Sequence, residues 1–327
     1  MAEAGKSIGE FTERLESELG KAIVGQGELL EETAAALLTG GHVLLEGVPG
    51  TAKTLLVRAL GRALDLSWGR IQFTPDLMPA DVTGSYVYRT EQAEFEFRRG
   101  PVFVNLLLAD EVNRAPAKTQ SALLEAMEEG AVTVDGERHE LPRPFVVFAT
   151  QNPLEHEGTY PLPEAELDRF LFKSVIDLPG RDEEIEILKR HRDGFDPRDL
   201  AAAGIQPVAG PEALAGLTAS VREGVEVEDV VLGYAADLVR QTRDWAGIAI
   251  GAGPRAAVHL MRAARALAAM RGRDFVLPDD VKRLSVPVLR HRIMLGAERE
   301  IEGVTPDDVI RDLVGSLEVP RTRKEQG

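Results

Sequence analysis

Three short apolar runs stand out in the first half of the chain, at residues 43–46, 106–111 and 144–152. Runs of this length, bounded by turn residues, are typical of buried strands. The first run is followed by a turn and then by apolar side chains that recur with helical spacing, which predicts a strand, a turn and an amphipathic helix in succession. That helix face consists of Leu55, Leu56, Ala59, Leu60, Ala63 and Leu64. Other elements expected in this half are helices at 8–19 and 28–38 and strands at 70–73 and 172–178.

Two hairpins are predicted to stand off this unit. Residues 85–88 and 95–98 alternate apolar and polar side chains on either side of the polar stretch 89–94, which is a hairpin pattern. A second hairpin is expected around Val132, Val134 and the turn at Asp135-Gly136, because this dipeptide suits a tight turn between two strands. The pattern leaves open whether either hairpin has a function or only decorates the surface.

The pattern changes to helices alone beyond Pro179. A chain of 327 residues favours two domains over one. We therefore expect a first domain over residues 1–179 and a helical second domain over 180–327, with an irregular linker around 194–210. The helices of the second domain are expected at 181–193, 211–223, 228–244, 254–271, 278–291 and 306–316.

Charge and composition exclude several classes of protein. The chain has 38 Lys and Arg against 54 Asp and Glu, a net charge of −16. This balance argues against nucleic-acid binding as the main activity, although a local basic stripe stays possible. The absence of cysteine excludes disulfides, iron–sulfur clusters and thiolate zinc sites. Because no apolar run approaches 18 residues, we expect no membrane insertion and a protein that is cytoplasmic or attached through partners.

The turn between the first strand and its helix has the composition of a phosphate-binding loop. It is rich in glycine and ends in Lys53-Thr54. Backbone N–H groups at a helix start lack intrahelical partners and bind phosphate oxygens. Lys53 can reach the outer phosphates of a nucleotide, and the Thr54 hydroxyl can bind Mg²⁺. The nucleotide-binding residues expected here are Gly47, Val48, Pro49, Gly50, Thr51, Ala52, Lys53, Thr54 and Leu55.

Ala52 departs from the usual glycine before the lysine. If the backbone there needs a positive φ, alanine costs roughly 1 kcal/mol relative to glycine. If φ is already helical, alanine fits without strain. The turn around Val24 and Gly25, between the two N-terminal helices, also has two interpretations: it could line an adenine pocket, or it could be a plain loop.

The second and third apolar runs end in polar residues suited to hydrolysis of a phosphoanhydride. Asp110 would hold Mg²⁺ and Glu111 would act as general base toward water, unless the pair is only a solvated strand end. Asn152, at the end of the third run, could orient the water or the γ-phosphate, although an Asn before Pro153 also suits a turn.

Two arginines complete the candidates. Arg169 could be presented to the γ-phosphate of a neighbouring subunit, or could simply pair with Asp168 at the surface. Arg255 follows Pro254 at the start of a helix and could face a nucleotide held by the first domain, or could be solvated.

Taken together, these stretches resemble the AAA+ ATPases and, within them, the MoxR family. The resemblance covers nearly the whole chain, in the order of the family. The matching stretches are 47–54, 109–116, 121–129, 149–153, 167–170 and 253–256. An alanine before the lysine is itself typical of MoxR proteins.

The resemblance implies an α/β fold: a P-loop αβα nucleotide-binding domain with a parallel sheet and β-hairpin inserts, followed by an all-helical lid. It implies Walker A at Lys53 and Thr54, Walker B at Asp110 and Glu111, and sensor 1 at Asn152. It also implies an arginine finger at Arg169 and sensor 2 at Arg255.

For function, the resemblance implies Mg²⁺-dependent ATP hydrolysis in a ring, commonly a hexamer. Such rings would remodel, mature or load metal into a partner protein, often one with a von Willebrand A domain. A metal-chelatase motor subunit is the nearest alternative, followed by a nucleic-acid motor and a scaffold that binds nucleotide without hydrolysing it.

Overall fold

The first domain is built on a parallel sheet of five strands. The computed structural model describes residues 2–48, 50–151 and 160–322. The strand order is β2-β5-β8-β1-β9, and every neighbouring pair is parallel. Their bounds are β1 (His42–Glu46), β2 (Trp68–Gln72), β5 (Leu106–Asp110), β8 (Val146–Gln151) and β9 (Phe170–Val175). The carboxyl ends of the five strands therefore lie along one edge of the sheet, which is where open α/β sheets bind ligands.

Alternate residues of the strands enter two separate cores. Leu106 and Leu108 pack with helices on one face of the sheet, and Leu107 and Ala109 pack on the other face. This follows from the two-residue period of a strand. Because both faces are covered, the strands are apolar throughout instead of alternating, which explains the continuous runs in the sequence.

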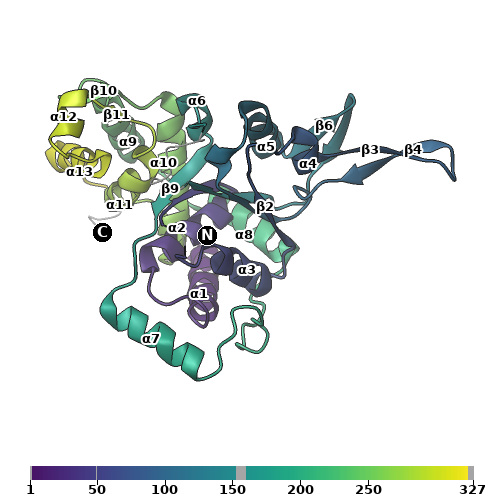
Figure 1. Cartoon of the computed structure of the whole chain (residues 1–327). Helices are drawn as coiled ribbons and strands as arrows, with labels where there is room; N and C mark the ends of the chain where they lie inside the picture. Colours follow the sequence, from purple (N-terminus) through teal and green to yellow (C-terminus); the bar gives the residue numbers. More distant parts are fainter. Residues whose placement is uncertain (1, 49, 152–159, 323–327) are drawn as a thin grey trace.

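Helices of the first domain cover both faces of this sheet (Figure 1). The larger core contains the apolar faces of α1 (Ala2–Leu19), α2 (Gly27–Thr39) and α3 (Lys53–Ala63). The smaller core contains α5 (Ala117–Glu129) together with Val82 of α4 (Pro79–Thr83). The arrangement is the three-layered αβα fold expected for the nucleotide-binding domain.

Both predicted hairpins are present, and they contact each other. The first, β3 (Gly84–Arg89) with β4 (Glu94–Arg99), projects far from the body in Figure 1. The second, β6 (Ala131–Val134) with β7 (Glu137–Glu140), directly follows α5. Phe97 of the first hairpin stacks on His139 of the second with ring centroids 3.8 Å apart. The Tyr86 hydroxyl also donates a hydrogen bond of 2.5 Å to Glu137.

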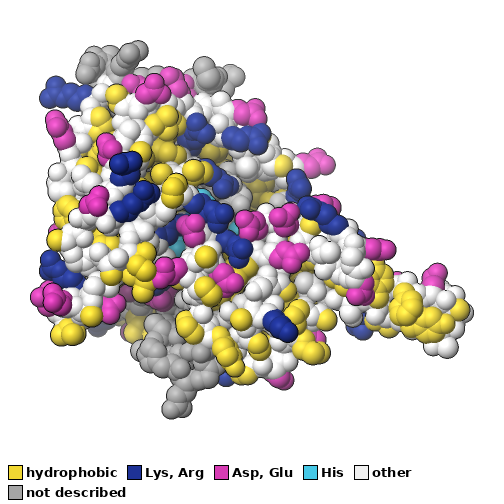
Figure 2. Space-filling model, turned by 90° about the horizontal axis from the view of Figure 1, so that it is seen from above, with side chains coloured by type: hydrophobic (Ala, Val, Ile, Leu, Met, Phe, Trp, Pro, Cys, Tyr) yellow, Lys and Arg dark blue, Asp and Glu magenta, His cyan; other side chains and the backbone are white. Residues whose placement is uncertain are grey.

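The end of the projecting hairpin is apolar. Figure 2 shows hydrophobic side chains covering the tip of this arm. Tyr88 is 51% exposed and Phe95 69% exposed, and their rings contact each other at 5.2 Å between centroids. Val87, beside them, is also exposed.

The second half of the chain is the helical lid. Its elements are α7 (Arg181–Arg192), α8 (Pro211–Gly224), α9 (Asp229–Gln241), α10 (Pro254–Met270), α11 (Pro278–Leu289), α12 (Ala297–Ile301) and α13 (Pro306–Ser316). A short antiparallel pair, β10 (Ile248–Ile250) with β11 (Met294–Leu295), adds to the helices that the sequence predicted. Helices α8 and α10 pack against α1 and α2, so the lid shares the larger core with the first domain. The division at residue 179 stays a prediction.

None of the residues of helix α7 is buried, a feature that it shares among the described lid helices only with the five-residue α12. Helix α7 stands apart from the other lid helices in Figure 1. Within the described ranges, the structure contains no helix with both the length and the apolar character needed to cross a membrane.

Candidate functional site

A cavity of about 640 Å³ opens at the carboxyl edge of the sheet. Its floor contains the loop between β1 and α3 and the ends of β2 and β5. Ala22, Ile23, Val24 and Gln26 of the N-terminal turn also line it, as do Ile187, Arg190 and His191 of α7. Helix α7 therefore has a role that its exposed sequence did not indicate, which is to form one wall of this cavity.

Most of the predicted nucleotide-binding residues line the cavity. They are Val24, Gly47, Gly50, Thr51, Ala52, Lys53, Thr54 and Leu55, together with Asp110 and Glu111. Gly25 and Val48 are described by the structure but do not line it. Pro49 and Asn152 lie outside the described residues.

The backbone conformation of the loop decides between the positive and the helical φ considered for Ala52. This residue has φ 60° and ψ 18°, which is the left-handed region, and it immediately precedes α3. Gly50 also has a positive φ of 87°. The first interpretation of Ala52 is therefore the correct one: the loop requires a positive φ there, and alanine adopts it at a cost of about 1 kcal/mol.

Lys53 begins α3 and points back over the loop. Its ammonium group donates a hydrogen bond to the carbonyl of Gly47. Burial lowers the pKa of Lys53, and the carboxylates of Asp110, Glu111 and Glu46 oppose that effect. The side chain is thus placed within the loop that would receive phosphates.

Asp110 is held by partners from the two neighbouring strands. Arg70 of β2 donates to its Oδ2 from both Nε (3.0 Å) and Nη2 (2.6 Å). The Thr150 hydroxyl of β8 donates to its Oδ1 at 2.6 Å. Carboxylate and hydroxyl oxygens are ligands that Mg²⁺ accepts, so Asp110 and Thr54 are suited to a magnesium ion at this edge of the cavity.

Glu111 also has two side-chain donors. Gln72 donates a hydrogen bond of 2.7 Å to its Oε2, and Arg114 donates one of 2.8 Å to the same oxygen. Its backbone lies in the left-handed region, with φ 56° and ψ 49°. A non-glycine residue in this conformation costs roughly 1–3 kcal/mol, and such strain is concentrated at functional sites.

Sequence reasoning missed four of these partners: Arg70, Gln72, Arg114 and Thr150. One signal could have revealed the first two, because Arg70 and Gln72 are two residues apart at the end of a predicted strand and so share one face. The hydrogen bonds of Arg70 to Asp110 and of Gln72 to Glu111 depend on β2 lying beside β5, and the sequence pattern does not specify that order.

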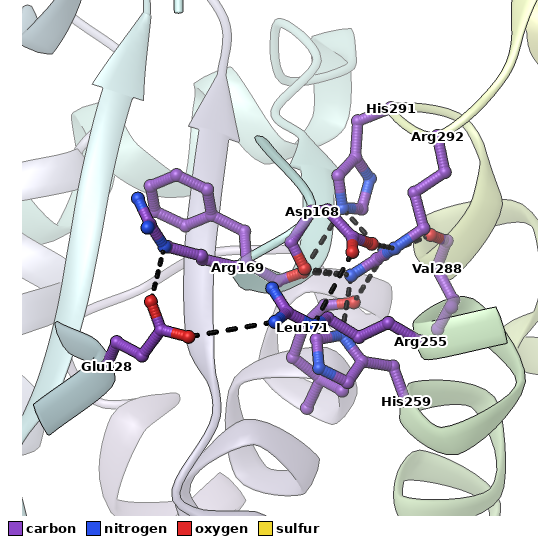
Figure 3. Close-up of polar contacts among 10 residues, drawn as sticks. Glu128, Asp168, Arg169, Leu171, Arg255, His259, Val288, His291 and Arg292 are labelled. Atoms are coloured by element: carbon purple, nitrogen blue, oxygen red, sulfur yellow. Dashed lines mark hydrogen bonds and ion pairs between the residues drawn. The ribbon is translucent and has the colours of Figure 1, made fainter. Parts of the chain in front are cut away.

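The two remaining candidates, Arg169 and Arg255, lie together but away from this cavity. Figure 3 shows both beside Glu128 of α5. Arg169 Nε is 3.0 Å from Glu128 Oε2, and Arg255 Nη2 is 3.6 Å from Glu128 Oε1. Arg255 Nε is also 3.6 Å from Asp168 Oδ2. Neither arginine lines the cavity of its own chain.

Comparison with known proteins agrees with this geometry. Residues 42–172 match the ATPase family associated with various cellular activities (AAA), and residues 240–313 match the AAA lid domain. A crystal structure of a protein from Cytophaga hutchinsonii, assigned as an ATPase, superimposes with a TM-score of 0.88 and 38% identity over 98% of both chains.

Several relatives match along most of their length. The uncharacterized protein YeaC of Bacillus subtilis is 44% identical over 96% of this chain and 98% of its own. Chaperone MoxR1 of Mycobacterium tuberculosis is 43% identical over 94% of this chain and 82% of its own. Protein MoxR of Paracoccus denitrificans is 35% identical over 87% of this chain and 89% of its own. With the nucleotide-binding fold, the lid and these relatives established, the chain belongs to the MoxR family of AAA+ ATPases.

Proposed function

We propose that this protein hydrolyses ATP with Mg²⁺ in a ring, and that each active site is completed by the neighbouring subunit. The observation that carries the proposal is the separation of two sets of residues. Lys53, Asp110 and Glu111 line the cavity, whereas Arg169 and Arg255 lie together at another place on the same chain.

The length of α5 gives the scale of that separation. The Glu111–Arg114 contact directly precedes this helix, and Glu128 is its second-to-last residue. Thirteen residues at 1.5 Å each make the helix roughly 20 Å long. An arginine paired with Glu128 is therefore too far away to reach a phosphate beside Glu111 of the same chain. In a ring, such an arginine would act on the nucleotide of an adjacent subunit.

The chemistry follows from the residues of the cavity. Backbone N–H groups of the loop and the Lys53 ammonium would bind the phosphates, and Thr54 and Asp110 would hold Mg²⁺. The metal, when bound, would neutralise charge on the phosphate oxygens. Glu111 would take the proton of the attacking water, and Asn152 would orient that water. Arg169, with Arg255 beside it, would stabilise the charge that develops on the γ-phosphoryl group of the neighbour.

We further propose a hexameric ring in the cytoplasm that remodels or matures a partner protein, with a von Willebrand A domain as the partner class. The name of one relative, Chaperone MoxR1, supports action on other proteins. The exposed ring pair of Tyr88 and Phe95 supports it as well, because aromatic side chains at a projecting tip can contact a client.

ATPase activity measured against protein concentration tests the proposal, with Glu111→Gln as the background. We expect the specific activity to rise steeply with concentration and to be abolished by Arg169→Ala, because arginine fingers are worth on the order of 10³–10⁵ in rate. A specific activity that is substantial at every concentration and insensitive to Arg169→Ala would refute shared active sites.

A further inference from the structure

Arg292 is a buried arginine that joins the lid to the first domain. It follows α11, and only 2% of its side chain is exposed. Figure 3 shows its guanidinium surrounded by groups from Asp168 and the start of β9 on one side and from α10 and α11 on the other. Helix α6 spans Glu164–Leu167, so Asp168 lies at the turn between α6 and β9.

The first domain supplies the stronger set of acceptors. Arg292 Nε donates a hydrogen bond of 2.7 Å to Asp168 Oδ1. Its Nη2 donates to the carbonyls of Asp168, at 3.0 Å, and Phe170, at 2.5 Å. The guanidinium therefore binds both the side chain and the backbone of the segment that leads into Arg169.

The carbonyl of Leu171 in β9 accepts from Nη1 at 3.4 Å, and the lid supplies further acceptors. The carbonyl of Val288 accepts a hydrogen bond from Nη1, and His259 Nδ1 lies 2.5 Å from Nη2. His291 Nε2 lies 2.7 Å from Nη1. Burial, followed by the charge of Arg292, lowers the pKa of His259 to about 3 and that of His291 well below its ordinary value. Both imidazoles are therefore neutral, as a partner of a buried cation must be.

A buried charge is a poor way to hold two domains together. Apolar side chains of similar volume usually do so at least as well, because a buried ion pair carries a desolvation cost. The guanidinium contributes geometric specificity, because it is a rigid planar fork whose N–H groups fix the positions of their acceptors. The residue whose geometry is fixed here is Asp168.

Asp168 in turn touches the arginine pair. Its Oδ1 accepts from Arg292, while its Oδ2 faces Arg255 at 3.6 Å. Arg169 is the next residue in the chain. On the other side, Glu128 contacts both Arg169 and Arg255. The carboxylate that Arg292 holds thus contacts Arg255 directly and belongs to the residue that precedes Arg169.

We propose that Arg292 is a positioning residue that, through Asp168, places Arg169 and Arg255 for the active site of the neighbouring subunit. The proposal rests on the proposed function, in which these arginines act on a neighbour. It makes the lid and the arginine pair a single unit, so that the placement of the lid in one subunit governs catalysis in the next.

A mixing experiment separates this role from a general effect on folding. Glu111→Gln subunits cannot activate water but still offer their arginines. Arg169→Ala subunits offer no finger but retain an intact cavity. Activity in a mixture of the two arises only where the cavity of an Arg169→Ala subunit meets the arginines of a Glu111→Gln subunit. We call the Glu111→Gln subunit the donor, because it supplies the arginines, and the Arg169→Ala subunit the acceptor, because it supplies the cavity.

Arg292→Lys, which keeps the charge but loses the fork, is then placed on one type at a time. On the donor it should lower the ATPase rate of the mixture at least tenfold. On the acceptor it should change the rate less than twofold and leave the KM for ATP unchanged. Arg290→Lys is the matched control, because Arg290 donates hydrogen bonds to Asp307 and the carbonyl of Lys173 and, among the described residues, forms neither a hydrogen bond nor an ion pair with Asp168. We expect it to be neutral on either type.

Each outcome decides a different point. Equal losses on donor and acceptor would mean that Arg292 only supports the fold, which overturns the inference, as would no loss on the donor. If the donor and acceptor fail to restore activity before Arg292 is changed, the proposed shared site is wrong instead. Asp168→Asn, which removes the carboxylate charge, should reproduce the donor-specific loss if Arg292→Lys does not fold.

Discussion

Glu32 is a buried carboxyl group whose removal should stabilise the protein at neutral pH. It lies on α2, is 5% exposed, and accepts a hydrogen bond from the Ser174 hydroxyl of β9. Burial raises its pKa from 4.5 to about 7, and the hydrogen bond from Ser174 and the nearby Arg290 and Arg283 only partly oppose that rise. Glu32→Gln removes the ionisable group while keeping an acceptor for Ser174.

The sign and size of the effect follow from proton linkage. Between pH 4.5 and about 7 the unfolded chain has lost the Glu32 proton and the native state keeps it, so native stability falls as pH rises through this window. Above about pH 7 the loss is complete. A pKa gap of about 2.5 units, at 1.36 kcal/mol each, corresponds to roughly 3 kcal/mol. Glu32→Gln avoids this loss.

Urea unfolding at pH 5 and pH 8 measures the prediction. The difference in free energy of unfolding between Glu32→Gln and the unmodified protein should shift in favour of the variant by about 2.5 kcal/mol from pH 5 to pH 8. Glu10→Gln, on an exposed face of α1, controls for the loss of a carboxylate and should stay within about 0.5 kcal/mol at both pH values. A difference for Glu32→Gln that is the same at pH 5 and pH 8 would refute the reasoning.

Three further predictions concern the cavity and the first hairpin. Ala52→Gly should raise the free energy of unfolding by about 1 kcal/mol, because glycine adopts the left-handed backbone without steric cost; lower stability in urea would contradict this. Gln72→Ala should lower kcat about tenfold with the KM for ATP unchanged, since a hydrogen bond to a charged group such as Glu111 is worth about 1.5–3 kcal/mol. A rise in kcat would mean that Gln72 restrains Glu111. Replacing Tyr88 and Phe95 together with serine should leave the basal ATPase rate within twofold and Tm within about 2 °C, because surface substitutions have small effects; a large fall in Tm would show that the tip is packed.

The sequence predicted what is locally determined. The strand, loop and helix from β1 to α3 follow from an apolar run, glycines and the Lys53-Thr54 pair, all within about twenty residues. The backbone angle of Ala52 could not be predicted, because the same residue fits either a helical or a left-handed φ. Asp168 and Arg292 are 124 residues apart, so their contact depends on how the lid packs, which no local pattern specifies.

Arg255 shows most clearly where a sequence motif stops being informative. Its position after Pro254 at the start of a helix suits a residue that faces phosphate. The motif does not specify whether that phosphate belongs to the nucleotide of the same subunit or of a neighbouring one. In the structure α10 packs along α1 and α2, on the far side of the sheet from α5, and its first turn meets the α6–β9 segment. That packing pairs Arg255 with Asp168 and Glu128 and keeps it out of the cavity of its own chain. If Arg255 acts on a nucleotide from there, that nucleotide belongs to another subunit, so Arg255→Ala should behave as Arg169→Ala does: inactivating on the donor in the mixing experiment and silent on the acceptor.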